Sequence, residues 1–291
     1  MSPVPSMLRR PWRWAYPRLQ RWLPAQHGHP LLAGLDRLAS LFHVLYNNDN
    51  FDPISNGEAW LLRRLAALGP PARTLCVFDV GANRGDYTRL ALAASPSVEV
   101  WAFEPVPAVF AQLQAAHASQ PRAHLHPLAL SAHDGLLTLY ADPRHSGHTT
   151  AVAGVQPGVH GLAQPELLEL PAQRLDSFCA AMGVTAIDLL KLDVEGYEQQ
   201  VLVGAQGLLA AAAIACIQLE YGRANLFSRT FIHDYQRLYG ASYRLGKLYP
   251  RGVLWFEGYT SRLDDLIGPN LVLVHRSRPD LIAALSLGHQ P

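Results

Sequence analysis

The stretch Phe78-Asp79-Val80-Gly81-Ala82-Asn83-Arg84-Gly85 decides how the rest of this 291-residue sequence is interpreted. It joins the run Leu75–Val80 to a helical pattern that begins at Asp86. The run is short and apolar on both faces, which is typical of a central strand in a parallel sheet. Gly81 and Gly85 remove Cβ atoms where a ligand would approach the backbone. The stretch therefore predicts a ligand-binding turn between a buried strand and a helix.

Outward from this turn, short apolar runs alternate with helical patterns, which indicates a mostly parallel sheet with helices on both faces. The predicted helices span Leu31–Tyr46, Glu58–Leu68, Asp86–Ala94, Pro107–His117, Arg174–Met182 and Glu198–Ala210. The predicted strands span Leu75–Val80, Val98–Phe103, His124–Leu130, Leu136–Tyr140, Ile187–Leu192 and Ile214–Glu220, followed by antiparallel Tyr243–Leu248, Val253–Phe256 and Leu271–His275. The segment Pro143–Pro171 shows no clear period. Ligands of such sheets bind at the carboxyl ends of the strands.

Composition narrows the classes of protein to which the chain can belong. Its residues are 49% hydrophobic and 16% charged, with a net charge of +1, so we expect a folded domain and no nucleic-acid partner. Cys76, Cys179 and Cys216 show no CxxC spacing, which favours free thiols and a cytoplasmic location. No uninterrupted apolar stretch reaches about 18 residues, so we expect no transmembrane segment.

We expect three parts along the chain: a basic and aromatic helical extension over residues 1–56, the main domain over 57–280, and a C-terminal tail over 281–291. The extension contains arginines and aromatic residues in alternation: Arg9, Arg10, Trp12, Arg13, Trp14, Tyr16, Arg18, Arg21 and Trp22. The first interpretation of this segment is a solvated arm. The second is an arm that touches an anionic membrane surface or a partner. The sequence does not indicate an oligomeric state.

Glu104 follows the second predicted strand, about 20 residues beyond the glycine turn. A carboxylate at this place accepts two hydrogen bonds from a ribose diol. Capping of the next helix is the alternative role for Glu104. A dinucleotide site requires G-x-G-x-x-G to bring the backbone against a pyrophosphate, whereas the spacing here is Gly81-x-x-x-Gly85. A cofactor with ribose but no pyrophosphate fits better, and Asp79 is suited to meet a cationic amino-acid end.

A third motif, Lys191-Leu192-Asp193-Val194-Glu195-Gly196-Tyr197-Glu198, follows the most apolar strand. In an extended backbone Asp193 and Glu195 project to the same side. Two carboxylates at a strand end are costly to place without a purpose. Capping of the following helix explains one of these carboxylates. The other is then a candidate for a role in binding or catalysis.

The turn Phe78–Gly85, the string Phe103-Glu104-Pro105-x-Pro107-x-x-Phe110 and the motif Leu190–Glu198 occur in an order and spacing that resemble the FkbM family of methyltransferases. Ala129-Leu130-Ser131 and Arg174-Leu175-Asp176-Ser177-Phe178 agree with the family as well. The resemblance covers roughly residues 58–275. It implies the class I methyltransferase (Rossmann-like) fold, a seven-stranded sheet with one antiparallel strand. It also implies S-adenosyl-L-methionine as the cofactor and transfer of a methyl group to an oxygen of a small-molecule natural product, a sugar or a glycan.

The resemblance also implies roles for individual residues. Asp79, Gly81, Asn83 and Gly85 would line the methionine part of the cofactor, and Glu104 would bind its ribose. Leu130 and Ser131 would approach the adenine, and Asp193 would lie beside the sulfonium.

A hydroxyl acceptor must lose a proton, so a base is expected within hydrogen-bond reach of it. Glu195 is the first candidate, Asp193 the second and His148 the third. Asp193, Glu195 and Glu220 are scattered and form no coordination pattern, so no metal site is predicted. Two other functions stay open at this point: a nicotinamide-dependent oxidoreductase, and a catalytically silent protein of the same fold that serves as a partner in an assembly.

Overall fold

The computed structural model describes residues 6–69 and 73–288. The contacts between Cα atoms divide the chain into two units, residues 1–47 and residues 48–291. The first unit consists of helices α1 (Ser6–Ala25) and α2 (Pro30–Tyr46). Pro30 occupies the first turn of α2, where its missing N–H has no intrahelical partner to lose. The helix predicted over Leu31–Tyr46 is confirmed.

The ends of the second unit differ from the expected domain limits. The side-chain amide of Asn48 donates to the carbonyl oxygens of Asn56 and Leu248, each at 2.9 Å, so residues 48–56 are held within the second unit. Helix α12 (Pro279–Leu285) buries Leu281 and Leu285 in the core. Contacts therefore place the unit boundary nine residues before residue 57, and they place much of the expected C-terminal tail in the fold.

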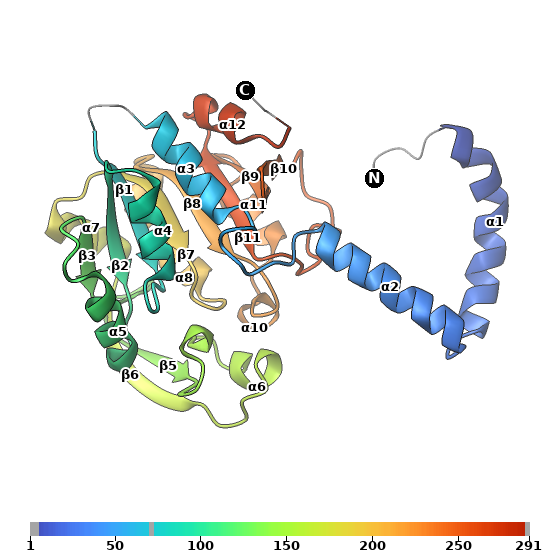
Figure 1. Cartoon of the computed structure of the whole chain (residues 1–291), viewed down its shortest axis with the longest axis horizontal. Coiled ribbons are helices and arrows are strands. Elements are labelled where there is room, and N and C mark those ends of the chain that lie inside the picture. The colour runs from blue at the N-terminus through green and yellow to red at the C-terminus, as the bar shows by residue number, and fades with distance from the viewer. Residues whose placement is uncertain (1–5, 70–72, 289–291) are drawn as a thin grey trace. The chain divides into compact units, whose positions relative to one another are not determined.

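An eight-stranded sheet forms the centre of the second unit, in the order β10-β9-β11-β8-β7-β1-β2-β3 (Figure 1). Its strands are β1 (Leu75–Val80), β2 (Val98–Phe103), β3 (Ala123–His126), β7 (Ile187–Leu192), β8 (Ile214–Glu220), β9 (Tyr243–Tyr249), β10 (Gly252–Trp255) and β11 (Asn270–His275). Strands β8, β7, β1, β2 and β3 are parallel neighbours, whereas β11 runs antiparallel to β8 and β9. The predicted mostly parallel α/β sheet is confirmed.

The number of strands expected from the family resemblance is wrong by one. Strand β10 forms a hairpin with β9, in which Gly252 pairs with Tyr249, and this hairpin adds an eighth strand at the edge of the sheet. Two strands, β10 and β11, thus run opposite to the other six, instead of one strand opposite to six.

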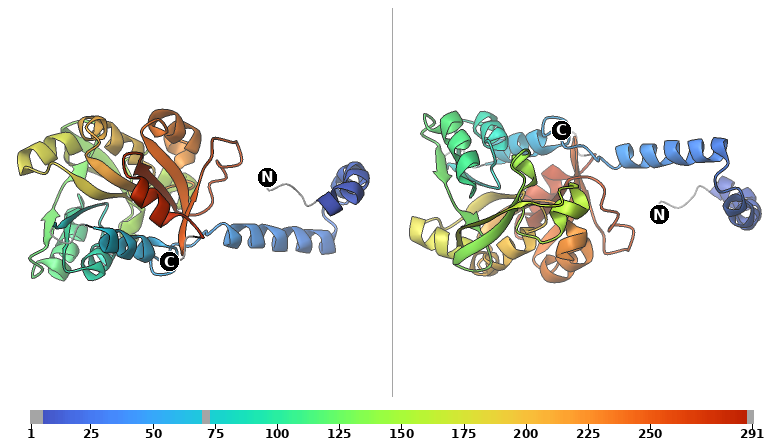
Figure 2. Two further views of the ribbon diagram at one scale, coloured as in Figure 1. Left: turned by 90° about the horizontal axis from the view of Figure 1, so that it is seen from above. Right: turned by 90° about the horizontal axis from the view of Figure 1, so that it is seen from below.

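Helices cover both faces of the sheet (Figures 1 and 2). On one face α3 (Glu58–Leu68), α4 (Asp86–Ala94), α5 (Pro107–His117) and α12 contribute residues to one core cluster. On the other face α7 (Leu175–Met182), α8 (Glu198–Val203) and α11 (Ile232–Tyr239) contribute to a second. Two large buried cores fit a sheet whose central strands are apolar on both faces, as the sequence predicted. The remaining helices of the second unit are short: α6 (Val155–Val159), α9 (Gln206–Ala210), α10 (Asn225–Ser228) and the 3₁₀ turn η1 (Ser146–His148).

A second, three-stranded sheet in the order β4-β6-β5 lies outside the central one. It contains β4 (Ala129–Leu130), β5 (Gly135–Ala141) and β6 (Glu166–Gln173). The single strand expected over His124–Leu130 is wrong, because the chain leaves the central sheet after His126 and pairs Ala129 with Ala172. Strand β6 was not expected inside the segment without a period.

Within residues 6–69 and 73–288, no helix combines the length and the apolar character needed to span a bilayer.

Candidate functional site

The register of three strands brings three motifs to one edge of the sheet. Val80 pairs with Phe103 on β2 and with Leu192 on β7, so these last strand residues lie in one row. The next residues along the chain are Gly81, Glu104 and Asp193. The edge lies where the chain order changes direction around β1, the place where open α/β sheets bind ligands. The parallel register alone thus assembles residues that are more than a hundred positions apart.

The turn after β1 is built on glycine for a steric reason. Gly81 has a φ of +82°, and a Cβ atom there would lie 1.9 Å from the carbonyl oxygen of Asp193. The N–H groups of Gly81 and Ala82 both donate to the carbonyl oxygen of Phe103, at 3.0 and 2.9 Å. Asn83 has a φ of +49°, a left-handed conformation that asparagine tolerates. The turn is therefore fixed against both neighbouring strands.

Glu104 is a buried carboxylate that faces the cleft. One oxygen accepts from the N–H of Asn83 at 3.1 Å, and the other accepts from the N–H of Val106 at 2.9 Å. Burial raises the pKa of Glu104 to about 7, although these two hydrogen bonds act in the opposite direction. A carboxylate has about four lone-pair positions, so two remain for a ligand. The capping role and a ligand-binding role are compatible at this residue.

A cleft that is partly open to solvent begins at this edge. Its polar wall includes Gly81, Asn83, Glu104 and Asp193. Its apolar wall includes side chains from the segment after β3, from β4 and from β5: Leu128, Ala129, Leu130, Leu137 and Leu139. A ligand with one flat apolar part and one polar part matches these two walls.

The segment after β5 passes over the cleft. Ser146 donates its hydroxyl hydrogen to the side-chain oxygen of Asn83 at 2.8 Å, and Gly147 lies beside the amide nitrogen of Asn83. Thr150 donates to the carbonyl oxygen of Glu195 at 2.7 Å. The segment therefore joins the turn after β1 to the turn after β7 and shields the cleft between them.

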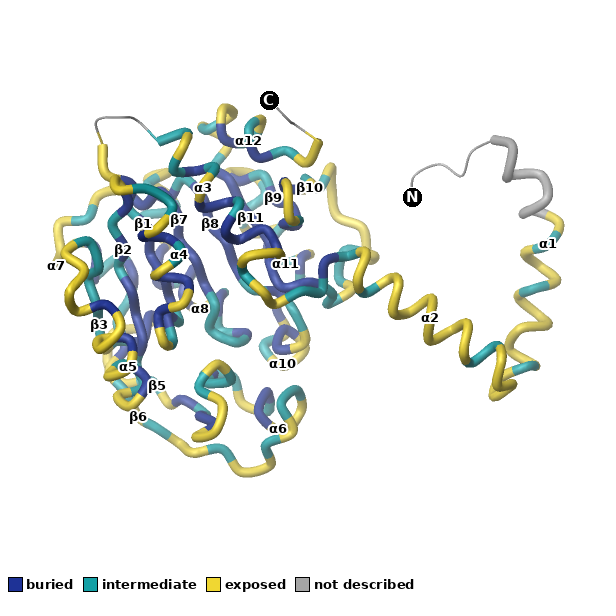
Figure 3. The backbone as a smooth tube through the Cα atoms, in the orientation of Figure 1, coloured by how far each residue is buried: buried dark blue, intermediate teal, exposed yellow. Residues whose placement is uncertain are grey.

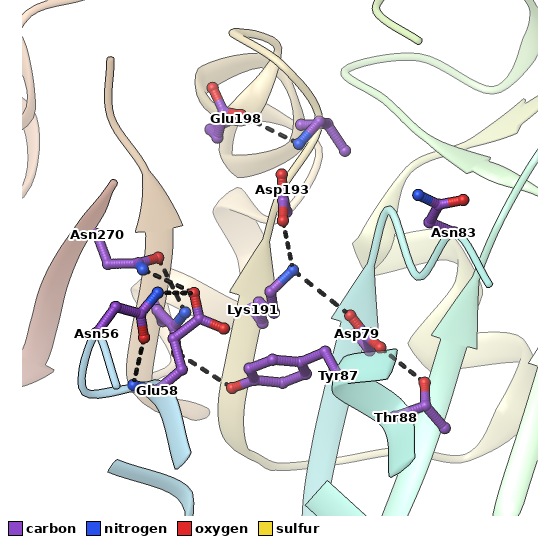
Figure 4. A network of polar contacts seen from close by, with 12 residues as sticks. Asn56, Glu58, Asp79, Asn83, Tyr87, Thr88, Lys191, Asp193, Glu198 and Asn270 are labelled. Atoms are coloured by element: carbon purple, nitrogen blue, oxygen red, sulfur yellow. Dashed lines mark hydrogen bonds and ion pairs between the residues drawn. The ribbon is translucent and has the colours of Figure 1, made fainter. Parts of the chain in front are cut away.

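Lys191 is a buried cation beneath the cleft, and the sequence reasoning gave it no role. Its ammonium lies 2.9 Å from an oxygen of Asp193 and 3.8 Å from an oxygen of Asp79 (Figure 4). Burial alone would lower the pKa of Lys191, but the carboxylates of Asp193, Asp79 and Glu58 raise it above the usual value. The only signal for this role in the sequence is a lysine inside an apolar strand, which requires a buried counter-ion.

Asp79 is directed into this network and away from the cleft. It is fully buried, and it accepts a hydrogen bond from the hydroxyl of Thr88 at 2.7 Å. It does not line the cleft. Asp193 does line it, and the ammonium of Lys191 holds the pKa of Asp193 below its usual value although burial opposes ionisation. The strand residue before the turn thus faces the interior, whereas the residue after β7 faces the ligand side.

Glu195 is paired with His160, a residue to which the sequence gave no role. The ring Nε2 of His160 lies 3.4 Å from the Glu195 carboxylate. The ring of His148 stacks on that of His160, with centroids 3.9 Å apart and planes 9° apart. Burial raises the pKa of Glu195, and the contact with His160 offsets part of this increase. His160 comes from the segment without periodicity, so sequence spacing offered no signal for the pair.

Glu198 braces the turn that carries Asp193 and Glu195. It is fully buried, and one of its oxygens accepts from the N–H groups of Val194 and Gly196, at 3.2 and 3.1 Å. Burial raises the pKa of Glu198 to about 8. Glu195 has a φ of +53°, a conformation that is held because this bracing and the bond from Thr150 act on the same few residues.

The structure brings together part of the predicted site. The cleft is lined by Gly81, Asn83, Glu104, Leu130 and Asp193. The other predicted residues lie close by but do not line it: Asp79, Gly85, Ser131, Glu195 and His148. Gly85 begins α4 and its carbonyl oxygen contacts His117, and the hydroxyl of Ser131 lies 3.1 Å from that of Tyr197.

In the described part of the chain, no group of three His, Cys, Asp or Glu side chains is arranged to hold a metal ion.

A family model and two relatives in sequence show to which known proteins the chain is similar. A family model described as the methyltransferase FkbM domain matches residues 79–245, more than half of the chain. The chain is 34% identical over 159 residues to 31-O-demethyl-FK506 methyltransferase FkbM of Streptomyces tacrolimicus, which covers 45% of this chain and 59% of that protein. It is 25% identical over 162 residues to 2-O-methyltransferase NoeI of Sinorhizobium fredii (strain NBRC 101917 / NGR234), which covers 52% and 65%. The chain thus spans less than two thirds of the length of either relative.

Solved structures resemble the chain more loosely. A precorrin-6y C5,15-methyltransferase from Geobacter metallireducens GS-15 superposes with a TM-score of 0.37 at 10% identity, and the match covers 74% of this chain and 87% of that chain. The fold assignment therefore rests on the strand order and register of the chain itself. With three motifs in one row at the edge of the sheet, and with a family model that begins at Asp79 and extends into β9, the chain belongs to the FkbM methyltransferase family.

Proposed function

We propose that this chain transfers a methyl group from S-adenosyl-L-methionine to a hydroxyl oxygen of an acceptor. The observation that carries the proposal is the row formed by Gly81, Glu104 and Asp193 along one cleft at the carboxyl ends of β1, β2 and β7. Membership of the FkbM family and the names of its two relatives support the same activity.

The residues of the cleft suit the parts of this cofactor. Glu104 keeps two acceptor positions for the ribose diol, and its two backbone donors hold it in place. Leu128, Leu130 and their apolar neighbours would pack against the adenine. Gly81 and Asp193 lie at the polar end, where the cofactor carries its methionine part.

Three other residues would support the cleft without contacting the cofactor. Asp79 would hold Lys191, Gly85 would begin helix α4, and Ser131 would fix Tyr197, a residue of the cleft wall. This assignment revises the roles that the family resemblance implies for Asp79, Gly85 and Ser131, because none of the three lines the cleft.

When bound, the cofactor supplies a methyl carbon already activated by a positive sulfur, so the protein has to align the acceptor, exclude water and remove one proton. Glu195 fits the proton acceptor best of the three candidates. Burial raises its pKa, which strengthens it as a base, whereas Lys191 weakens Asp193 as a base by lowering its pKa. His160 would share the proton that Glu195 receives. His148 would support His160 through the ring stack.

The acceptor we propose is a hydroxyl of a small natural product, a sugar or a glycan. The names of the two relatives point to a 31-O position of FK506 and to a 2-O position, both oxygen acceptors. A net charge of +1 offers little attraction to a nucleic acid. Three free cysteines support a reducing, cytoplasmic location.

The two alternatives have less support. A nicotinamide-dependent oxidoreductase would need a G-x-G-x-x-G turn, and this chain has Gly81-x-x-x-Gly85. A catalytically silent member of the fold would tolerate the loss of cleft residues, and this chain keeps Gly81, Asn83 and Glu104 in the cleft wall.

Isothermal titration with S-adenosylhomocysteine and with NAD separates the three functions. We expect the full chain to bind S-adenosylhomocysteine and to leave NAD unbound. Binding of NAD alone would end the methyltransferase proposal, and binding of neither would favour the silent protein. Mass spectrometry of candidate glycans and polyketides, after incubation with isotopically labelled cofactor, then identifies the acceptor class by a labelled methyl group.

A further inference from the structure

Helix α1 has one basic side and one apolar side. It contains five arginines and no Asp or Glu: Arg9, Arg10, Arg13, Arg18 and Arg21. With 3.6 residues per turn, Tyr16, Leu19 and Leu23 follow one another on one side of the helix. Trp22 is 52% exposed and Tyr16 is 50% exposed, so large aromatic surfaces accompany the arginines.

Helix α2 carries an apolar face that nothing in the first unit buries. Its exposed residues recur at spacings of four and three: Leu31, Leu35, Leu38, Phe42 and Leu45. These side chains are 54% to 75% exposed together with Leu41 and Tyr46, and no residue of α2 is buried (Figure 3). Soluble monomers rarely expose an apolar patch of this extent. The face therefore requires a partner.

We propose that helices α1 and α2 form a binding surface for an anionic lipid membrane, with both helices lying along the lipid–water interface. The arginines of α1 complement the negative charge of lipid headgroups. Tryptophan and tyrosine prefer the interface, where an apolar ring and a polar edge are both satisfied. A helix with one charged side and one apolar side lies in the interface plane.

The same observations disfavour a second copy of the chain as the occupant. Two α1 helices with five arginines each and no carboxylate would repel one another. The apolar seam of α2 extends over about two heptads, which is shorter than the three to four heptads that a coiled coil usually needs. The membrane proposal uses residues of the first unit alone, so a test of it does not depend on whether the chain transfers methyl groups.

Co-sedimentation of the full chain with lipid vesicles tests the surface. Vesicles of phosphatidylcholine with phosphatidylglycerol at a ratio of 3:1 are compared with vesicles of pure phosphatidylcholine. We expect at least about 10-fold stronger binding to the anionic vesicles, because each arginine near the surface adds to the attraction. We also expect binding to weaken several-fold in high salt, since the screening length shortens. Tryptophan emission should shift to shorter wavelength as Trp14 and Trp22 enter the interface.

Two double variants separate the contributions. Arg18→Glu with Arg21→Glu reverses charge on α1 and should lower binding to anionic vesicles at least about 10-fold. Leu35→Ser with Leu38→Ser removes apolar surface from α2 and should lower binding to a similar extent. The matched control is Arg251→Glu with Arg262→Glu, which makes the same change in net charge at exposed positions of the second unit. This control should bind vesicles like the unmodified chain, and all three variants should keep its unfolding midpoint.

Several results would overturn the proposal. One is equal binding to neutral and anionic vesicles, or none to either. Another is a control variant that loses binding as much as the α1 variant, because the effect would then come from net charge and not from the arm. A dimer in light scattering that Leu35→Ser with Leu38→Ser dissociates, without vesicle binding, would assign the face to a second copy.

Discussion

At the scale of single residues, three carboxylates at the cleft hold their protons differently because their neighbours differ. Asp193 has the ammonium of Lys191 at 2.9 Å, which lowers its pKa. Burial raises the pKa of Glu195, the ring of His160 offsets part of this increase, and the charge of Asp193 adds to it. Glu104 meets two backbone N–H groups, yet burial raises its pKa to about 7. Asp193, Glu195 and Glu104 therefore differ in pKa although they lie at the same edge of the sheet.

The raised pKa of Glu104 predicts a pH dependence of cofactor binding. A ribose diol donates to the ionised carboxylate, so a proton on Glu104 competes with the ligand. Affinity for S-adenosylhomocysteine should be constant above pH 8 and should fall below pH 7, by up to about 10-fold per pH unit. Titration calorimetry from pH 5.5 to 8.5 measures this. The variant Glu104→Gln should show weaker binding with a flat profile, and a flat profile in the unmodified chain would contradict the assignment.

The base role of Glu195 predicts a separation of binding from turnover. Glu195→Gln should keep the affinity for S-adenosylhomocysteine, because Glu195 does not line the cofactor cleft. It should lower kcat about 10²- to 10⁴-fold through loss of the proton acceptor. His160→Asn should reduce kcat less, with cofactor affinity again unchanged. If Glu195→Gln kept full activity, the base role would move to Asp193 or His148.

The buried cation of Lys191 predicts a large loss of stability when it is removed. Lys191→Met leaves Asp79 buried without its counter-ion and should lower the free energy of unfolding by about 3–5 kcal/mol, measured by urea denaturation. The double variant Asp79→Asn with Lys191→Met should recover part of this loss, since the uncompensated charge is gone. A single variant as stable as the unmodified chain would mean that the network contributes little to folding.

At the scale of elements, the turn after β1 depends on its closeness to the turn after β7. Gly81→Ala places a Cβ where the carbonyl oxygen of Asp193 lies, at a φ of +82°. We expect a loss of unfolding free energy of at least about 2 kcal/mol and weakened binding of S-adenosylhomocysteine. Gly222→Ala is the matched control, because its Cβ would meet no atom within 4 Å. Urea unfolding curves and titration calorimetry measure both variants. If Gly81→Ala and Gly222→Ala lost the same unfolding free energy and the same affinity, the close approach of Gly81 to Asp193 would not matter.

The strands and helices of the central sheet were predictable because their periods are clear. Helix Glu58–Leu68 and strands Leu75–Val80 and Ile187–Leu192 match the structure in type and bounds. The helix predicted over Glu198–Ala210 is two helices, since the carbonyl oxygen of Gly204 accepts from the N–H of Asp176 on α7. Local periodicity carries no information about such a contact with a distant segment.

Strand β6 was missed for a related reason. Pro171 lies inside it and is typical of a break, but it has a neighbouring strand on one side only, because it pairs with Leu136 of β5 whereas β4 pairs with Ala172 and Gln173. The contact of His160 with Glu195 depends on the same unpredicted segment. The site residues that directly follow a strand, such as Gly81, Glu104 and Asp193, could therefore be predicted from the sequence. The role of His160, which lies between β5 and β6, could be found only in the structure.

At the scale of the whole molecule, one chain combines a unit of the FkbM family with two helices that the family match does not include. The match begins at Asp79, and the apolar face of α2 ends before Asn48. The two proposals, methyl transfer by the second unit and membrane contact by the first, therefore rest on different residues. Each can fail without the other.

Cofactor binding by Glu104 is the central claim, and titration calorimetry of S-adenosylhomocysteine with Glu104→Ala tests it most directly. The matched control is Glu99→Ala, which changes a half-exposed carboxylate on the same strand. We predict that Glu104→Ala binds about 100-fold more weakly, through loss of charge-assisted hydrogen bonds to the ribose, and that Glu99→Ala binds like the unmodified chain. Unchanged affinity in Glu104→Ala, with the fold intact, would contradict the placement of the cofactor in this cleft.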